Sequence, residues 1–328
     1  STLDRSSAAS DVYKRQRMKI LSVIILSKNN GRTLGYTLLS VLRAAVPEGW
    51  GREIIVVDAR SSDNTPRILE AFRKYIRVIY DEGRGIGIAR NLGVSSAKGE
   101  IICFVDADCV VGRDHFVRIV NAVEEGGAEL IDVKGGKGPA ETPVEELEQR
   151  VWEWGRAYSS ELTRDRCFAG GSFISFKRDV FERIGGFWEH PPYGADDLDF
   201  SYRAYRSGFK ISVVPSPGSY CRHRRNLLDL VKQQVGWGRG YAHLMVKYRS
   251  HYDFWKCYRW STLVYKLFGE SIHLYPIFAC VLAPIKGLYL AVRSRDWRLI
   301  PYWTLRRWAF LYGMLRELGA RRARRIAS

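Results

Sequence analysis

This sequence lacks several features from which a protein class can be assigned directly. The six cysteines form no C-x-x-C pair and no Cys/His spacing typical of zinc sites, which argues against a structural zinc module. We expect them to be reduced structural cysteines in a protein that faces the cytoplasm. The first residues contain no apolar signal-peptide core, so nothing indicates secretion. Residues 1–17 are polar and aperiodic, and we expect a disordered or artificial tail there.

Acidic residues are scarce in the last third of the chain. Residues 203–328 contain 24 Lys+Arg against 5 Asp+Glu, whereas residues 1–202 contain 28 against 30. A near-neutral body is therefore joined to a strongly basic final part, which favours binding to the phosphate of nucleic acid or of anionic lipid. No motif typical of nucleic-acid-binding proteins occurs, so we expect membrane lipid and no nucleic acid as a partner.

A clean membrane-spanning segment is also lacking. Residues 272–292 form the most apolar window and are long enough for a bilayer core of about 30 Å, but two prolines, a histidine and a lysine interrupt them. Residues 299–315 are apolar but contain two arginines. We expect imperfect transmembrane helices and a basic tail over residues 271–328.

Tryptophan, tyrosine and arginine mixed with leucine characterise residues 227–248 and 254–268. This composition is typical of helices that lie in the membrane interface, so we expect amphipathic interfacial helices over residues 226–270. The alternative is a buried helical subdomain with a solvated basic face.

The body of the chain, by contrast, is rich in apolar runs, and 46% of all residues are hydrophobic. Continuous β-branched runs predict buried strands, and 3.6-residue spacing predicts helices between them. The expected strands are 20–26, 53–57, 77–80 and 100–105, alternating with helices over 33–45, 65–72 and 86–97. Further on we expect helices over 143–162, 180–184 and 199–207 and strands over 172–176 and 211–214. This alternation is typical of an α/β fold whose mainly parallel sheet has helices on both faces.

Three of the expected strands end at polar residues. The first ends at Ser27, Lys28 and Asn29, the second at Asp58, and the fourth at Asp106. Ligands of such sheets bind outside the carboxyl ends of the strands, so these side chains are candidates for a binding site. Asp58 alone has a second interpretation, as the cap of the following helix.

The pair Asp106 and Asp108 follows a buried strand, and both carboxylates point off the sheet edge. Hard divalent cations such as Mn²⁺ or Mg²⁺ bind oxygen ligands of this kind. An isolated D-x-D is common on protein surfaces. Its position after a buried strand, downstream of two other polar strand ends, makes it a candidate metal site.

Taken together, the motifs SVIILSKNN (22–30), EIIVVDARSSDNT (53–65), GIARNLG (87–93) and FVDAD (104–108) resemble the family 2 glycosyltransferases. The resemblance covers residues 18 to about 234 and implies a GT-A fold, with a catalytic domain over residues 18–225. It also implies an enzyme that uses a nucleoside-diphosphate sugar and a divalent cation. In that family the ends of the first two strands contact the nucleoside.

The resemblance assigns the donor site residue by residue. Ser27, Lys28, Asn29 and Asp58 match the nucleoside contacts. Arg84, Arg90 and Asp106 lie where the family approaches the base, the diphosphate and the metal. Leu26 and the Ala-Arg pair at 59–60 depart from the usual pattern, which puts the choice of base in doubt; GDP-mannose and UDP-glucose are the two donors we expect.

The segment ADDLDFSYR (195–203) is similar to the acceptor segment of the family. Asp197 matches the catalytic aspartate, which takes the proton of the attacking hydroxyl. Asp196 replaces the usual glutamate, and Asp199 fits a helix cap. Trp188 is a candidate for stacking on an acceptor sugar, with packing as its alternative role.

Beyond the body, His223 lies where the family often has a histidine near the metal, so it is a candidate third ligand. The run QQVGWGRG (233–240) resembles the Gln-x-x-Arg-Trp motif of cellulose-synthase-like enzymes. Gln233 and Trp237 match as acceptor residues, but Gly236 stands where arginine belongs, and Arg239 is the only nearby substitute. This departure speaks against a processive polymer synthase.

These features predict an inverting, metal-dependent hexosyltransferase acting on a lipid-linked acceptor at the cell membrane, with its catalytic domain facing the cytoplasm. The resemblance leaves a second candidate, a polyprenyl-phosphate transferase of the dolichyl-phosphate mannose synthase type, whose acceptor is already an anion and needs no base. A non-catalytic basic module that binds membrane or nucleic acid is the third.

Overall fold

The computed structural model describes residues 18–160, 167–189, 194–251, 253–254 and 275–327. The tail expected over residues 1–17 lies outside this part of the chain, as does nearly all of the helix expected over residues 254–268. The division into a catalytic domain (18–225), interfacial helices (226–270) and membrane helices (271–328) stays a prediction.

A seven-stranded sheet forms the centre of the body. Its spatial order is β3 (Arg77–Tyr80), β2 (Trp50–Asp58), β1 (Lys19–Ser27), β4 (Ile101–Phe104), β7 (Ile174–Lys177), β6 (Leu130–Gly135) and β8 (Ile211–Ser216). Only β7 runs antiparallel to its neighbours. The expected mixed, mainly parallel sheet is confirmed, because the β-branched runs are buried on both faces, as in β1 where Val23, Ile24 and Ile25 are 0% exposed.

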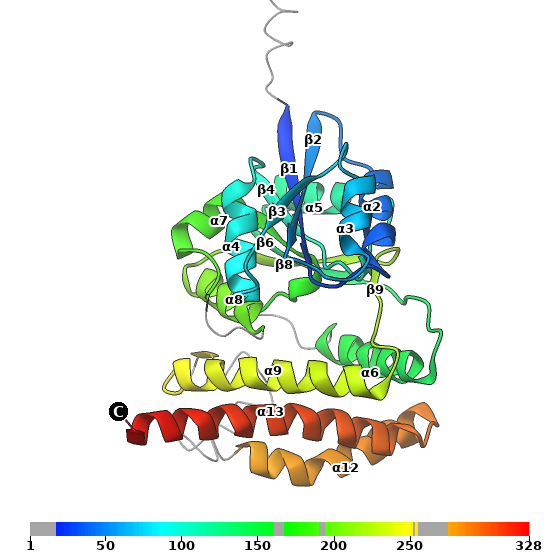
Figure 1. Ribbon diagram of the computed structural model, residues 1–328, viewed down its shortest axis with the longest axis vertical. Helices are drawn as coiled ribbons and strands as arrows, with labels where there is room; N and C mark the ends of the chain where they lie inside the picture. Colours follow the sequence, from blue (N-terminus) through cyan, green and yellow to red (C-terminus); the bar gives the residue numbers. More distant parts are fainter. Residues whose placement is uncertain (1–17, 161–166, 190–193, 252, 255–274, 328) are drawn as a thin grey trace, which may run out of the picture.

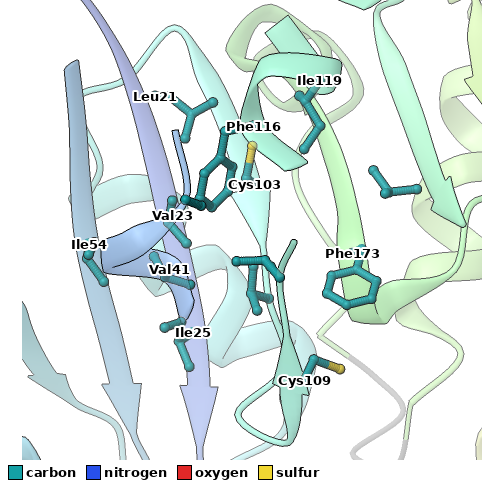
Figure 2. Close-up of a cluster of buried hydrophobic side chains, with 14 of the residues drawn as sticks. Leu21, Val23, Ile25, Val41, Ile54, Cys103, Cys109, Phe116, Ile119 and Phe173 are labelled. Atoms are coloured by element: carbon teal, nitrogen blue, oxygen red, sulfur yellow. The ribbon is translucent and has the colours of Figure 1, made fainter. Parts of the chain in front are cut away.

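Helices cover both faces of the sheet (Figure 1). On one face lie α2 (Leu34–Arg43), α3 (Thr65–Ala71) and α5 (His115–Glu124). On the other lie α4 (Ile86–Ser96), α7 (Arg178–Ile184) and α8 (Asp196–Arg206). Figure 2 shows part of the first core, with Val41 of α2 and Phe116 of α5 on the side chains of the central strands. The hydrophobic core therefore lies between the sheet and the helices. The carboxyl ends of the strands remain available to form a functional site.

Some elements differ from the expected ones. The two-residue strands β5 (Cys109–Val110) and β9 (Tyr220–Cys221) pair with each other and are too short to show a period. We also did not predict β6 or α5. Helix α8 begins at Asp196 rather than at Asp199, because Ala195 adopts a left-handed conformation (φ 68°) that sets the start of the helix.

In the part of the chain that the structure describes, four further helices form a layer under the carboxyl ends of the strands. Figure 1 shows α6 (Pro143–Ser160) and α9 (Leu227–Lys247) next to the body, then α13 (Leu299–Ala327), and α12 (Tyr275–Ser294) farthest from the sheet. Among the described residues, none of the helices combines the length and the apolar character that crossing a bilayer requires. The expected transmembrane helices therefore have no support in this part of the chain.

Helices α9 and α13 cross at two glycines. A Cβ atom on Gly238 would lie 1.9 Å from the carbonyl oxygen of Phe310, and one on Gly313 would lie 2.2 Å from that of Val235. Gly236, two residues from Gly238 on the same helix, has nothing within 4 Å of the corresponding position. Only glycine lets the two backbones approach this closely at the crossing.

The expectation of reduced cysteines is wrong. Cys109 of β5 and Cys221 of β9 form a disulfide, and Cys167 is also disulfide-bonded. Cys103 and Cys280 are free. The strands that carry Cys109 and Cys221 lie 112 residues apart in sequence, so their pairing depends on the tertiary fold, which local spacing does not reveal. The cysteine argument for a cytoplasmic catalytic domain falls with it, because disulfides persist in oxidising compartments.

The glycine crossing predicts opposite outcomes for two alanine substitutions in α9. Gly238→Ala should lower the free energy of unfolding by about 1–3 kcal/mol, because the new methyl group forces the two helices apart. Gly236→Ala should raise it by about 0.5–1 kcal/mol, since alanine is the better helix former and meets no neighbour. Denaturant unfolding measures both; equal effects of the two substitutions would contradict the crossing.

Candidate active site

The first three polar strand ends meet at one edge of the sheet. In the register of the parallel strands, Ser27 of β1 lies beside Asp58 of β2, and Asp58 lies beside Tyr80 of β3. The backbone of Val105, just after β4, donates to Ile24 of β1, so Asp106 follows at the same edge. The fold thus brings together side chains from the ends of β1, β2 and β4.

The end of β1 is joined to the loop after β2. Asn29 has a left-handed backbone (φ 55°), and its side-chain oxygen accepts a hydrogen bond from the backbone of Ser62 at 2.9 Å. The hydroxyl of Ser27 is buried and, among the described residues, has no hydrogen-bond partner. Lys28 is exposed, with its Nζ atom 3.6 Å from the Cβ position of Gly83. The end of β1 is therefore a polar segment at the sheet edge, with one buried hydroxyl that no hydrogen bond satisfies.

Asp58 is fully buried and holds the turn that follows it. Its Oδ2 atom accepts from the backbone N–H of Ser61 at 2.9 Å and its Oδ1 atom accepts from the Ser61 hydroxyl at 2.6 Å. Asp58 therefore holds the turn at Ser61 and does not cap the following helix, whose N-cap is Asn64. Each of its oxygens retains a lone pair. Arg84, in the loop before α4, is exposed.

Asp81 was not identified from the sequence. It follows β3 directly, is buried, and accepts a hydrogen bond from the backbone of Gly83. An acid immediately after a strand is the same signal that marked Asp58 and Asp106, so the pattern could have found it. With it, four strand ends carry polar side chains at this edge.

The expected metal pair lies together. Ligand atoms of Asp106, Asp108 and Cys109 all fall within 4.8 Å of one another. Because the sulfur of Cys109 is in the disulfide, only the two carboxylates are available to a cation. Burial and the neighbouring charge of Asp106 raise the pKa of Asp108 to about 6, although Arg224, 3.6 Å away, counteracts this.

His223 does not belong to this cluster of ligand atoms. Its ring stacks on Trp152 of α6 with 6.3 Å between the ring centroids. The assignment of His223 as a third metal ligand stays a prediction. His223 comes shortly after β9, the strand that the disulfide links to β5. The backbone N–H of its neighbour Arg222 donates to the carbonyl of Asp108 at 2.9 Å.

Arg90 of α4 is buried and does not reach out towards solvent. Its guanidinium forms an ion pair with Asp196 at 3.0 Å and lies over the rings of Phe104 and Phe187, at 5.3 and 5.2 Å from their centroids. Burial alone would lower the pKa of Arg90, but the charges of Asp196, Asp197 and Asp106 raise it. Arg90 therefore lies at the centre of the acids that the sequence had assigned to two separate sites.

The acid pair lies in the first turn of α8. Asp196 is 1% exposed, whereas Asp197 is half-buried and accepts hydrogen bonds from the backbone N–H groups of Gly171 (2.8 Å) and Leu198 (2.9 Å). Burial is the main cause that raises the pKa of both carboxyls, that of Asp196 to about 6, and Arg90 counteracts it. Asp197 is thus the member of the pair with a partly accessible carboxylate.

Two consecutive residues connect this acid pair to the metal pair. Gly171 donates its backbone N–H to Asp197, and the carbonyl of Ser172 accepts from the backbone N–H of Asp106 at 3.1 Å. A Cβ atom on Gly171 would lie 2.5 Å from Arg90 and 2.9 Å from the Asp197 carboxylate. The two motifs, far apart in sequence, therefore form one site.

Two of the expected acceptor residues, Trp188 and Trp237, lie close to α9 or to the segment before α8, and Trp188 also packs against the core cluster that contains Tyr202. Lys247 of α9 lies 4.0 Å over the ring of Trp188. The ring of Trp237, which is 37% exposed, comes within 3.9 Å of the Cβ position of Gly194, two residues before Asp196. Helix α9 thus forms one wall of the site.

Gln233 and Arg239 point in different directions. With its amide oriented to satisfy both groups, Gln233 accepts from Arg224 at 3.2 Å, and Arg224 faces Asp108. Arg239 instead forms an ion pair with Glu317 of α13 at 3.0 Å. Helix α9 is therefore connected to Asp108 through Gln233 and Arg224. Arg239 does not replace the arginine that is absent at position 236.

The charges of the site fit a divalent cation. Four carboxylates (Asp106, Asp108, Asp196 and Asp197) face two guanidinium groups (Arg90 and Arg224), which leaves two negative charges among these six side chains when all are ionised. Oxygen ligands at the carboxyl end of a strand are what Mn²⁺ and Mg²⁺ require. Asp106 and Asp108 would hold the ion.

Comparison with known proteins identifies the family and the fold. The model of the family "Glycosyl transferase family 2" matches residues 22–185. The chain is 24% identical over 306 residues to the poly-beta-1,6-N-acetyl-D-glucosamine synthase of Staphylococcus epidermidis, an alignment that covers 88% of this chain and 70% of that protein.

Two solved structures share the fold. The mannosyltransferase PcManGT from Pyrobaculum calidifontis, in complex with GDP-Man and Mn²⁺, superposes with a TM-score of 0.59 at 16% identity over 91% of this chain and 86% of that one. S. aureus TarS 1-349 in complex with UDP-GlcNAc superposes with a TM-score of 0.51 at 18% identity over 92% of each chain. At these identities the likeness concerns the fold, and the assignment of individual site residues stays a prediction.

Arg84 and Arg90, which the family resemblance assigns to the same donor site, should respond differently to substitution. Arg90→Met leaves Asp196 as an unpaired buried charge and should lower the free energy of unfolding by about 3–5 kcal/mol. Arg84→Met changes an exposed side chain and should stay within about 0.5 kcal/mol of the unsubstituted protein. Urea denaturation at pH 7.5 compares them; an Arg90→Met protein as stable as Arg84→Met would contradict the buried ion pair.

Proposed function

Because the chain belongs to the family 2 glycosyltransferases, we propose that it transfers a sugar from a nucleoside-diphosphate sugar to an acceptor hydroxyl beside Asp197, with inversion at the anomeric carbon. The observation that carries this proposal is the junction at Gly171 and Ser172, whose backbone holds the metal pair and the acid pair together. A donor on one side and an acceptor on the other would then meet within a single site.

The donor half is the sheet edge. The segment of Ser27, Lys28 and Asn29 at the end of β1, with Asp58 and Asp81 at the ends of the next two strands, would hold the nucleoside. Asp106 and Asp108 would hold a divalent cation, which would supply positive charge where the diphosphate leaving group gains negative charge. The solved mannosyltransferase binds Mn²⁺, which supports Mn²⁺ or Mg²⁺ here.

The sugar is proposed at the level of a hexose. Sequence motifs favour GDP-mannose or UDP-glucose, and the names of the relatives add N-acetylglucosamine. Residues 59–60 depart from the family pattern within the loop that would contact the base, so the nucleotide must be found by binding. This choice does not alter the rest of the mechanism.

The acceptor half is the start of α8. The half-buried Asp197 is the group we propose as general base, because its raised pKa favours proton uptake and its two backbone hydrogen bonds fix its direction. Asp196, tied to Arg90, holds the turn in place. Trp188 and Trp237 would flank the acceptor sugar.

The acceptor is proposed to be linked to a lipid, and the protein to act at the cell membrane. The support is the strongly basic final third of the chain and the helical layer under the site. The cytoplasmic orientation is no longer supported by the cysteines and has not been tested. Retained nucleic-acid affinity at physiological salt would instead favour a binding module.

The donor and the metal are tested by thermal unfolding with nucleoside diphosphates. The right nucleotide with Mn²⁺ should raise the melting temperature, since a ligand at 100 times its Kd stabilises by about 2.7 kcal/mol. Asp108→Asn should abolish the Mn²⁺-dependent part of the shift. Asp114→Asn, which changes an exposed acid outside the site, should retain it. A full shift in the Asp108→Asn protein would refute the metal assignment.

The general base is tested by transfer rates. Asp197→Asn should lower kcat for a hydroxyl acceptor by about 100- to 10,000-fold with little change in donor affinity. A polyprenyl-phosphate acceptor, already an anion, needs no base. Undiminished transfer to such a lipid in the Asp197→Asn protein would overturn the hydroxyl acceptor in favour of the polyprenyl-phosphate reaction.

A further inference from the structure

The outer side of α12 and α13, farthest from the sheet, carries a concentration of exposed apolar side chains. Of the 23 large hydrophobic side chains that are exposed among the described residues, 12 lie between residues 278 and 315. We call this surface the apolar face; it comprises Phe278, Val281, Leu282, Ile285, Leu288, Tyr289, Val292, Trp297, Leu305, Trp308, Tyr312 and Leu315. A contiguous surface of this kind on a folded protein marks an interaction site.

The apolar face follows helical spacing on both helices. On α12 it recurs every three or four residues from Phe278 to Val292, and on α13 from Leu305 to Leu315. The opposite side of α12 is buried and, apart from Leu290, consists of small residues. It packs on α13, where a Cβ atom on Gly287 would lie 2.9 Å from the carbonyl of Ile300. Each helix is thus held by protein on one side and is apolar on the other.

The segment that carries the apolar face has a strong excess of positive charge. Residues 271–328 contain 11 Lys+Arg and 2 Asp+Glu. Both acids point inward and are ion-paired: Asp296 is 8% exposed and binds Arg298, and Glu317 is 6% exposed and binds Arg239. Two of the cations are paired as well, Arg298 with Glu146 and Arg306 with Glu148 of α6. The segment still carries a clear net positive charge beside the apolar face, which complements an anionic lipid surface and opposes a second copy of the same face.

Tyrosine and tryptophan are interspersed with the aliphatic side chains. Tyr289, Trp297, Trp308 and Tyr312 are each at least 44% exposed. Such amphipathic rings prefer the level of the lipid headgroups. Lys286 and Arg293, at 5.1 and 6.0 Å from the ring centroid of Tyr289, keep cationic groups beside the apolar stripe.

We propose that the apolar face binds an anionic membrane, with α12 and α13 lying in the plane of the interface. The inference deepens the membrane part of the proposed function and names the surface responsible. It does not rest on donor, metal or acceptor chemistry. Because the strand ends open toward the helical layer, binding in this orientation places the site on the membrane side of the body (Figure 1).

The test is co-sedimentation of the 328-residue protein with vesicles, without nucleotide or metal. Vesicles with 30% phosphatidylglycerol in phosphatidylcholine should bind the protein, and pure phosphatidylcholine should bind it less. Ile285→Glu should lower the partition coefficient about 10-fold or more, since burial of an isoleucine is lost and a like charge to the lipid is added. Tyr75→Glu is the matched control, because Ile285 and Tyr75 are both 62% exposed.

Several outcomes would overturn the proposal. These are absence of vesicle binding, equal binding of the Ile285→Glu and Tyr75→Glu proteins, or a dimer in sedimentation equilibrium that Ile285→Glu dissociates while vesicles stay unbound. Val281→Glu, at the 69% exposed position of the same face, repeats the test should Ile285→Glu shift the melting temperature. A loss of vesicle binding should leave the nucleotide-dependent shift in melting temperature unchanged. The membrane surface and the proposed transfer activity can therefore be refuted independently.

Discussion

A buried guanidinium among carboxylates is the constraint on which this active-site geometry depends. Arg90 comes from α4, and the carboxylates around it come from the end of β4 and from the start of α8. Taking these charges out of water costs several kcal/mol for each ion unless they are paired. The pairing with Asp196 therefore fixes where α8 begins with respect to the sheet, and with it the position of Asp197.

Other contacts secure the remaining parts of the site in the same way. The disulfide between β5 and β9 ties the strand after Asp108 to the segment that carries Arg224. Arg224 in turn connects Asp108 to Gln233 of α9. Elements from distant parts of the sequence thus converge on two pairs of acids, and the helical layer is joined to the site and not merely packed beneath it.

The mainly parallel sheet and its polar strand ends could be predicted from the sequence, because continuous β-branched runs and the acids that follow them are local patterns. The role of Arg90 could not. The family resemblance assigns Arg90 to the base or diphosphate, whereas in the structure it is buried beside an acid more than a hundred residues away in sequence. Asp81 could also have been predicted, because it directly follows a strand. No local sequence pattern marks the disulfide partners or the two-residue strands.

The C-terminal helices show the limit of composition as a guide. Apolar residues mixed with arginine predicted both spanning and interfacial helices. Only the packing reveals that small residues on α12 face α13 while the large ones face outward.

The central claim is that one cation at Asp106 and Asp108 sits within a site whose base is Asp197. Anomalous scattering from Mn²⁺ in crystals grown with a nucleoside diphosphate tests it most directly. We predict a single strong peak between the carboxylates of Asp106 and Asp108, in contact with the diphosphate and on the side that faces α8. A peak bound elsewhere, or a diphosphate held without these two carboxylates, would contradict the account.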